Sequence, residues 1–74
     1  MISIYNVRLI LESKKEVDLK YWDKEGNIVE ANGVVCTSSY KENNTFNLLH
    51  VISKEVRTIR AWNIFEFNGV EVML

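Results

Sequence analysis

The C-terminal part of the chain carries a β-hairpin signature that limits the possible folds more than any other local pattern. Two stretches of alternating apolar and polar residues, Phe65–Phe67 and Val70–Val72, are separated only by Asn68–Gly69. An Asn-Gly pair accepts the positive φ angles of a type I′ turn, whose twist matches that of the two flanking strands. The sequence therefore predicts an antiparallel hairpin over residues 65–72.

The register of this hairpin has an electrostatic consequence. It places Glu66 opposite Glu71 on the side that faces away from the core. Like charges in opposed positions destabilise a sheet unless a cation lies beside them. We expect Arg60 or Arg57 to supply that cation.

The residue types of the whole chain extend the β-strand prediction. Val, Ile and Thr account for 19 residues, whereas only two are Ala. Side chains branched at Cβ fit a pleated sheet better than a helix. Alternation and turn residues place the remaining expected strands at 2–12, 16–22, 28–40, 46–52 and 56–61.

Two of these strands have irregular features. In residues 2–12 the alternation changes phase near Tyr5–Asn6, which predicts a bulge or bend. In residues 28–40 a glycine, Gly33, interrupts the apolar pattern and predicts a sharp bend. The strand at 46–52 is apolar on both faces, so we expect it to be buried or covered by a partner.

Residues 53–64 allow two interpretations. A helix is supported by Ser53 as N-cap and by apolar residues at helical spacing through Val56 and Ile59. A strand followed by a short turn at Trp62–Asn63 is supported by Val56, Thr58 and Ile59, because branched side chains crowd a helix. We prefer the strand, and the helix remains the alternative.

We expect these segments to supply five or six strands of one sheet, and that number of short strands without a crossover helix is typical of a small antiparallel barrel. The segment Arg57–Phe65 resembles SH3-like and Sm-like small barrels, in which a strand carrying Arg-x-Ile-Arg precedes a one-turn 3₁₀ helix and a final short strand. The resemblance implies one barrel domain over residues 1–74, with at most one short helix or 3₁₀ turn near 53–64. The chain also resembles short bacterial or mobile-element proteins.

Few residues are suited to catalysis or cofactor binding. Cys36 and His50 are the sole cysteine and histidine, and the three glycines form no phosphate-binding loop. We therefore expect no enzyme activity, no metal and no cofactor. A single cysteine predicts no internal disulfide and favours the reducing cytoplasm, and no apolar run is long enough to cross a membrane.

Aromatic and arginine side chains form the candidate interaction surface. Tyr, Trp and Arg are enriched in protein interface hot spots, and the same residues stack on and contact single-stranded nucleic acid. Trp22 belongs to this set because it follows the polar phase of residues 16–22. A net charge of −1 favours a protein partner over nucleic acid. The candidate residues are Trp22, Tyr40, Arg57, Arg60 and Trp62.

These observations predict a non-enzymatic binding or assembly module. A chain of 74 residues buries only about 60% of its unfolded surface, so self-association is a realistic source of extra stability. We expect the protein to bind a protein partner or itself through an edge strand and the candidate surface. The alternative is a regulatory protein that binds RNA or single-stranded DNA.

Overall fold

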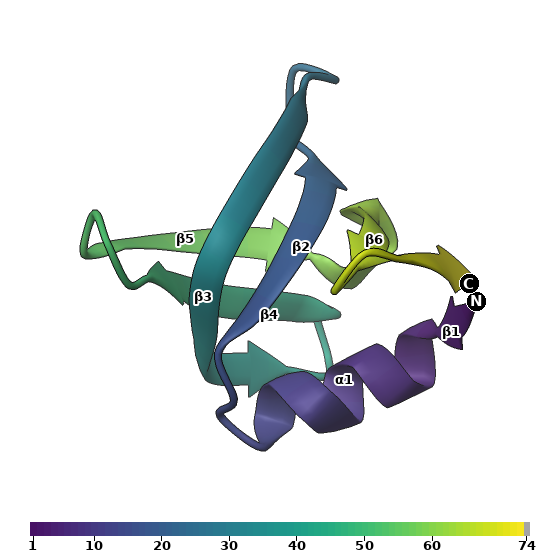
Figure 1. Ribbon diagram of the computed structural model, residues 1–74. Coiled ribbons are helices and arrows are strands. Elements are labelled where there is room, and N and C mark those ends of the chain that lie inside the picture. The colour runs from purple at the N-terminus through teal and green to yellow at the C-terminus, as the bar shows by residue number, and fades with distance from the viewer. Residues whose placement is uncertain (74) are drawn as a thin grey trace.

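A computed structural model describes residues 1–73 and contains one mixed sheet, one α-helix and one 3₁₀ turn (Figure 1). The seven strands of this part of the chain follow the spatial order β1-β7-β6-β2-β3-β4-β5. The elements are β1 (Ile2–Ser3), α1 (Ile4–Glu12), β2 (Val17–Trp22), β3 (Ile28–Tyr40), β4 (Thr45–His50), β5 (Glu55–Arg60), η1 (Ala61–Asn63), β6 (Ile64–Phe67) and β7 (Val70–Met73).

The predicted mostly-β class is confirmed, but the predicted strand count is wrong. The sheet has seven strands instead of five or six. Its first strand, β1, pairs in parallel with β7 at one end of the sheet. Between residues 1 and 73 no strand pairs with the outer side of β1 or of β5, so the sheet is open. The edges of the sheet are therefore the two-residue β1 and the six-residue β5.

The predicted strand at 2–12 is wrong beyond Ser3, where helix α1 begins. The Ser3 hydroxyl accepts a hydrogen bond from the Asn6 N–H at 3.2 Å and caps the helix. Val7 and Leu11 are spaced by one helical turn, and both are fully buried. The phase change that indicated a bulge is explained by the start of this helix.

The bend in β3 is confirmed at Gly33, which has a φ angle of 74°. The Gly33 N–H donates a 2.8 Å hydrogen bond to a carboxylate oxygen of Asp18 on β2. Before the bend β3 pairs with β2, after it β3 pairs with β4, and Val34 directly after Gly33 pairs with both neighbouring strands. A single 13-residue strand thus links the two halves of the sheet (Figure 1).

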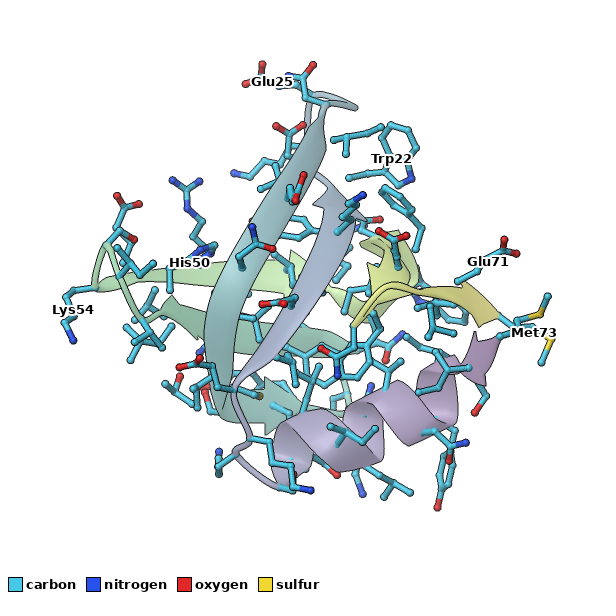
Figure 2. The ribbon with its side chains drawn as sticks, in the orientation of Figure 1. Trp22, Glu25, His50, Lys54, Glu71 and Met73 are labelled. Carbon is cyan, nitrogen blue, oxygen red and sulfur yellow. The ribbon has the colours of Figure 1, made fainter. Side chains whose placement is uncertain are left out.

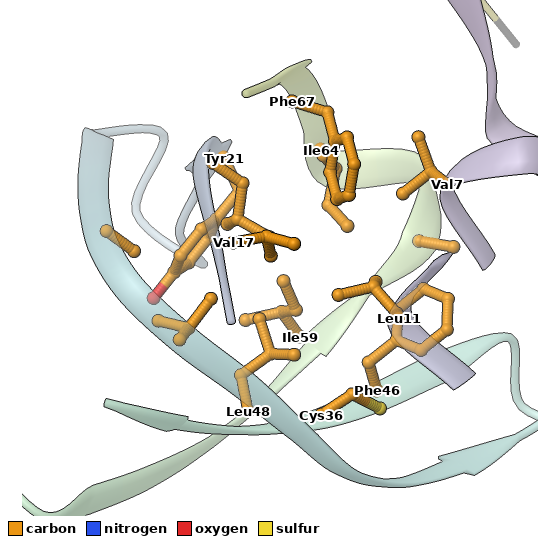
Figure 3. Close-up of a cluster of buried hydrophobic side chains, with 14 residues drawn as sticks. Val7, Leu11, Val17, Tyr21, Cys36, Phe46, Leu48, Ile59, Ile64 and Phe67 are labelled. Carbon is orange, nitrogen blue, oxygen red and sulfur yellow. The ribbon is translucent and has the colours of Figure 1, made fainter. Parts of the chain in front are cut away.

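The core lies between the concave side of the sheet and helix α1 (Figure 3). It contains aliphatic and aromatic side chains from every element except β1 and β7. The same core includes the one cysteine. Its buried residues are Val7, Leu11, Val17, Leu19, Tyr21, Ala31, Val34, Cys36, Phe46, Leu48, Ile59, Ala61, Ile64 and Phe67.

The C-terminal hairpin is confirmed, with positive φ angles at Asn68 and Gly69. Glu66 lies opposite Glu71 as predicted. The predicted cation is wrong: Lys20 on β2 provides it, with its Nζ atom 2.9 Å from Glu66 Oε2. Strand β2 pairs with β6, whereas the arginine-bearing β5 lies at the far edge of the sheet.

The strand interpretation of residues 53–64 is confirmed, and the helix alternative is wrong. β5 is followed by the 3₁₀ turn η1 and then by β6. The fourth strand is shorter than predicted, because β4 ends at His50 and Ile52 lies in a turn with 89% of its surface exposed. Within the described residues, no helix is long and apolar enough to span a bilayer.

Candidate functional groove

A groove of about 900 Å³ lies between the end of β2 and strand β5. It combines aromatic, hydroxyl, amide and charged side chains, and it extends along the edge of the sheet. We refer to it as the β5 groove. Its lining residues are Tyr21, Trp22, Asp23, Lys24, Thr45, Arg57, Thr58, Ile59, Arg60 and Asn63.

Trp22 forms the aromatic wall of the β5 groove. As the last residue of β2 it follows three alternating buried positions and points to the opposite side, where 42% of its surface is exposed. Its ring packs against Phe65 of β6 with a centroid distance of 5.2 Å and an interplanar angle of 36°. Phe65 thus supports the indole, and Trp22 remains partly exposed at the surface of the molecule (Figure 2).

Tyr21 closes the inner end of the groove. Burial raises the pKa of its phenol above the ordinary value; Arg57 acts against this increase in pKa, and Asp23 adds to it. The phenol is therefore neutral at physiological pH and available as a hydrogen-bond donor. Both charged residues that influence its pKa also line the groove.

The groove carries positive charge on β5 and on the turn that follows β2. Arg57 donates a 2.9 Å hydrogen bond to Glu55 on the same strand, and the side chains of both residues are more than half exposed. Lys24 and Arg60 form no salt bridge with any residue from 1 to 73. Apart from the paired Arg57, the lining therefore offers two cations against one acidic residue, Asp23.

The structure brings together only part of the predicted interaction surface. Trp22, Arg57 and Arg60 line the β5 groove, but Tyr40 and Trp62 do not. Both of the excluded aromatic side chains are about half exposed or more, at 49% and 60%. Their exposure agrees with a surface position, but the single five-residue patch expected from residue types is divided.

The strand register explains the position of Tyr40. Tyr40 pairs with Thr45, and Thr45 pairs with Arg60, so these side chains form one row across β3, β4 and β5 on the outer face. Arg57 has the opposite parity along β5 and belongs to the concave face. Tyr40 is thus two strands away from Arg60 and continues the outer side of the edge.

The sequence did not reveal a row of polar side chains that begins at Thr58 in the groove and continues beyond it to Asn47 and Ser38. Thr58 donates a 2.6 Å hydrogen bond to Asn47, and Asn47 donates one of 2.9 Å to Ser38. These three side chains form a second row on the outer face, beside the row of Tyr40. The alternation of Thr58 with Arg57 was visible in the sequence, but the pairing of the three strands was not.

Arg8 is a second residue that the sequence did not single out. From α1 its guanidinium lies 4.8 Å from the centroid of the Phe46 ring and donates a hydrogen bond to Asn44. This contact attaches the helix to the β3–β4 hairpin and lies outside the groove. The spacing of Val7 and Leu11 was the signal that could have revealed the helix and its inner face.

Cys36 and His50 lie apart from the groove. The Cys36 thiol is fully buried and donates a hydrogen bond to the Ser38 carbonyl at 3.2 Å. Burial raises its pKa above the ordinary value, which favours the unreactive thiol over the thiolate. The buried Nε2 atom of His50 has no hydrogen-bond partner within residues 1–73, so no hydrogen bond joins it to Cys36.

A smaller hollow of about 290 Å³ lies on the outer face over β2, β3 and β6. Asp18, Glu30 and Glu66 line it together with Lys20, which is paired with Glu66. No group of three or more His, Cys, Asp or Glu residues in the described part of the chain is arranged to hold a metal ion. Of the two hollows, only the β5 groove combines aromatic walls with charges that lack partners.

No protein-family model, curated protein or solved structure matches the chain.

Proposed function

We propose that this protein is a non-enzymatic binding or assembly module that engages a protein partner, or a second copy of itself, through β5 and the β5 groove. One observation carries the proposal. The longest edge strand of the sheet borders the groove in which Trp22, Arg57 and Arg60 meet. An edge strand beside an aromatic and arginine surface offers both backbone and side-chain contacts to a second polypeptide.

The order of the five central strands supports a small barrel as the scaffold. Strands β6, β2, β3, β4 and β5 are neighbours in this order, and η1 connects β5 to β6. This succession agrees with the SH3-like and Sm-like resemblance, and the strong bend of β3 turns the two ends of this set toward each other (Figure 1). The proposal therefore includes an SH3-like or Sm-like architecture, to which β1, α1 and β7 are additions.

The proposal also includes a cytoplasmic location. Its support is the single cysteine, which is buried and cannot form a disulfide within the chain.

Site-specific photocrosslinking tests the proposed function. A variant with benzoylphenylalanine in place of Trp22 is illuminated in cells that produce it, and crosslinked proteins are identified by mass spectrometry. The matched control carries the same group in place of Tyr5, which is 66% exposed on α1. We expect protein adducts from position 22 and not from position 5. A chain that stays monomeric in light scattering and yields no protein adduct from position 22 contradicts the proposal.

Binding of single-stranded nucleic acid is the second candidate function. The specific observation in its favour is that Trp22 provides a stacking surface beside Lys24 and Arg60, which have no salt bridge among the described residues. Affinity for an oligonucleotide then decreases steeply with salt and requires both Arg57 and Arg60. Binding that is independent of salt, or that survives replacement of both arginines by alanine, rejects this function.

A further inference from the structure

We infer that the β5 groove binds an extended acidic segment of a partner protein, which adds to the sheet as an antiparallel strand beside β5. This inference rests on the proposed function and specifies it: the partner is bound by strand addition, and its carboxylates contact Arg57 and Arg60. Three features of the structure lead to it: the direction of the backbone groups of β5, the regularity of that edge, and the charge along it.

The backbone of β5 presents a regular set of donors and acceptors to its open side. The N–H of Ala61 donates to the carbonyl of Asn44, and the register of β4 and β5 pairs Thr45 with Arg60 without any shift. Because bonded pairs alternate in an antiparallel ladder, Ile59, Arg57 and Glu55 also direct their backbone groups toward β4. The intervening residues Val56, Thr58 and Arg60 therefore direct their N–H and C=O groups away from the sheet.

This edge lacks several of the devices that protect natural sheet edges, and its charged side chains Glu55, Arg57 and Arg60 limit only the charge of a strand that can be added. β5 contains neither a proline nor a bulge, and five of its six residues are exposed. The opposite edge of the sheet is the two-residue strand β1, which offers a shorter surface. Strand addition is thus favoured at β5, where three residues supply free backbone groups in one continuous row.

Charge selects the kind of strand that fits. Arg57 faces the concave side and Arg60 faces the outer side, since their positions along β5 differ in parity. A strand laid beside β5 places two of its own residues, three positions apart, opposite these arginines. Carboxylates at those two positions gain charge-assisted hydrogen bonds, whereas basic side chains are repelled.

A second copy of the protein fits this edge less well. If two copies pair their β5 strands about a twofold axis so that one sheet continues into the other, even-numbered residues lie opposite even-numbered ones and odd opposite odd. Two such registers pair five residues of each β5, one centred on Arg57 and one centred on Thr58. In the register centred on Arg57, the two Arg57 side chains lie directly opposite each other. In the register centred on Thr58, they are diagonal neighbours. A partner with acidic side chains avoids this repulsion.

The inference is tested with the full chain and a defined peptide, acetyl-Thr-Val-Glu-Thr-Val-Glu-Val-Thr-amide, whose two glutamates are three positions apart. Calorimetry measures its affinity beside versions that carry Lys or Gln in place of both glutamates. In the antiparallel register, the glutamates at the third and sixth peptide positions lie opposite Arg60 and Arg57. The backbone N–H of the fifth position then points toward Thr58 of β5, and the backbone N–H of the fourth position points away from β5 into solvent. We expect N-methylation at the fifth position to weaken binding at least about 10-fold and N-methylation at the fourth to have little effect.

Substitutions in the protein provide the complementary test. We expect Arg57→Ala and Arg60→Ala each to weaken binding of the glutamate peptide about 3- to 5-fold, as is typical of exposed ion pairs. Lys15→Ala is the matched control, since Lys15 is an exposed cation outside the groove, and it should leave the affinity unchanged. The Gln version of the peptide should not respond to either arginine substitution.

Several outcomes overturn the inference. Equal effects of the two N-methylations exclude strand addition, and equal affinities of the Glu and Lys peptides exclude the acidic partner. Failure of the glutamate peptide to bind also overturns the inference. If protein adducts from position 22 or a concentration-dependent mass are still found, the proposed function survives this failure. If a single-stranded oligonucleotide binds in place of the peptide, the nucleic-acid function replaces both.

Discussion

The Nζ atom of Lys20 lies 2.9 Å from Oε2 of Glu66, at the position where Glu66 faces Glu71 across the C-terminal hairpin. Lys20 thereby compensates a like-charge pair that belongs to two other strands. The hydrogen bond to Glu66, together with its charge, raises the pKa of the ammonium above the ordinary value. The stabilising effect of Lys20 is complete below the pKa of the unfolded chain, about 10.4, and is lost as the pH rises through the folded-state pKa.

Replacing this cation should lower thermal stability at neutral pH. Lys20→Met keeps most of the aliphatic stem and removes the charge, so Glu66 and Glu71 repel each other without compensation. We expect a lower melting temperature for Lys20→Met by circular dichroism, and recovery in the double variant Lys20→Met with Glu71→Gln. Equal melting temperatures of the wild type and Lys20→Met contradict the assignment of Lys20 as the compensating cation.

The packing of helix α1 can be tested at two leucines of the same helix. Leu11 is fully buried, whereas Leu9 is 49% exposed. Leu11→Ala should decrease the free energy of unfolding by about 2–5 kcal/mol, and Leu9→Ala by less than about 0.5 kcal/mol. Because a loss of this size approaches the total stability of a small domain, Leu11→Met is the milder variant, with an expected loss below about 1.5 kcal/mol. Urea denaturation measures all three, and similar losses for both alanine variants contradict the packing.

Cys36 should react slowly with thiol reagents in the folded protein. Its side chain is fully buried, and burial raises its pKa. We expect the native chain to react with a disulfide reagent at neutral pH at least about 100-fold more slowly than the chain unfolded in urea, given a stability of at least about 3 kcal/mol. Similar rates in the two states show that the strand pair around Cys36 opens readily.

The same thiol contributes to a loss of stability in alkaline solution. Because the pKa of the Cys36 thiol is higher in the folded chain than in the unfolded chain, the unfolded chain loses the thiol proton at lower pH, above about 8.5. The contribution of the thiol to stability is therefore unchanged below this pH and decreases as the pH rises above it. Tyr21 acts in the same direction at higher pH, above about 10, because burial also raises its pKa. Urea titrations at pH 8 and pH 10 should show a smaller decrease for Cys36→Ala than for the wild type.

Asp18 joins two turns that are distant in the sequence. Its carboxylate accepts the Gly33 N–H at the bend of β3, and its backbone exchanges hydrogen bonds with Asn68 in the C-terminal hairpin. Asp18→Ala should decrease the free energy of unfolding by about 1 kcal/mol, and Asp18→Asn should retain much of it because an acceptor oxygen remains. Hydrogen exchange at the Gly33 amide should accelerate in Asp18→Ala and stay slow in Asp18→Asn.

Local sequence signals predicted the elements whose geometry is determined by neighbouring residues. Asn68–Gly69 defines its own turn, and the branched residues of β5 favour a strand irrespective of the rest of the chain. Helix α1 was missed because a helix of nine residues depends on the packing of one face, and alternation of Val7, Leu9 and Leu11 fits a strand equally well. Such short apolar segments are assigned by tertiary contacts.

Contacts between distant strands were predicted less well. Residue type alone selected Trp22, Arg57 and Arg60, which meet in the β5 groove. It could not separate them from Tyr40 and Trp62, because their separation depends on register and on the place of each strand in the sheet. The same lack of sheet order led to arginines being expected beside Glu66 where Lys20 is found.

The parallel pairing of β1 with β7 places Ile2 beside Val72 and Ser3 beside Met73, at the end of the strand order opposite to β5 (Figure 1). A fluorescent protein or affinity tag joined before Met1 therefore emerges beside β7, at the end of the strand order opposite to β5. The adjacency also makes circular permutation feasible, with a short linker between the old ends and new ends opened in the exposed turn at Lys24–Glu25. Because that turn follows Trp22, one of the new chain ends of such a permutant lies next to Trp22, the aromatic wall of the groove. Strand β5 stays intact.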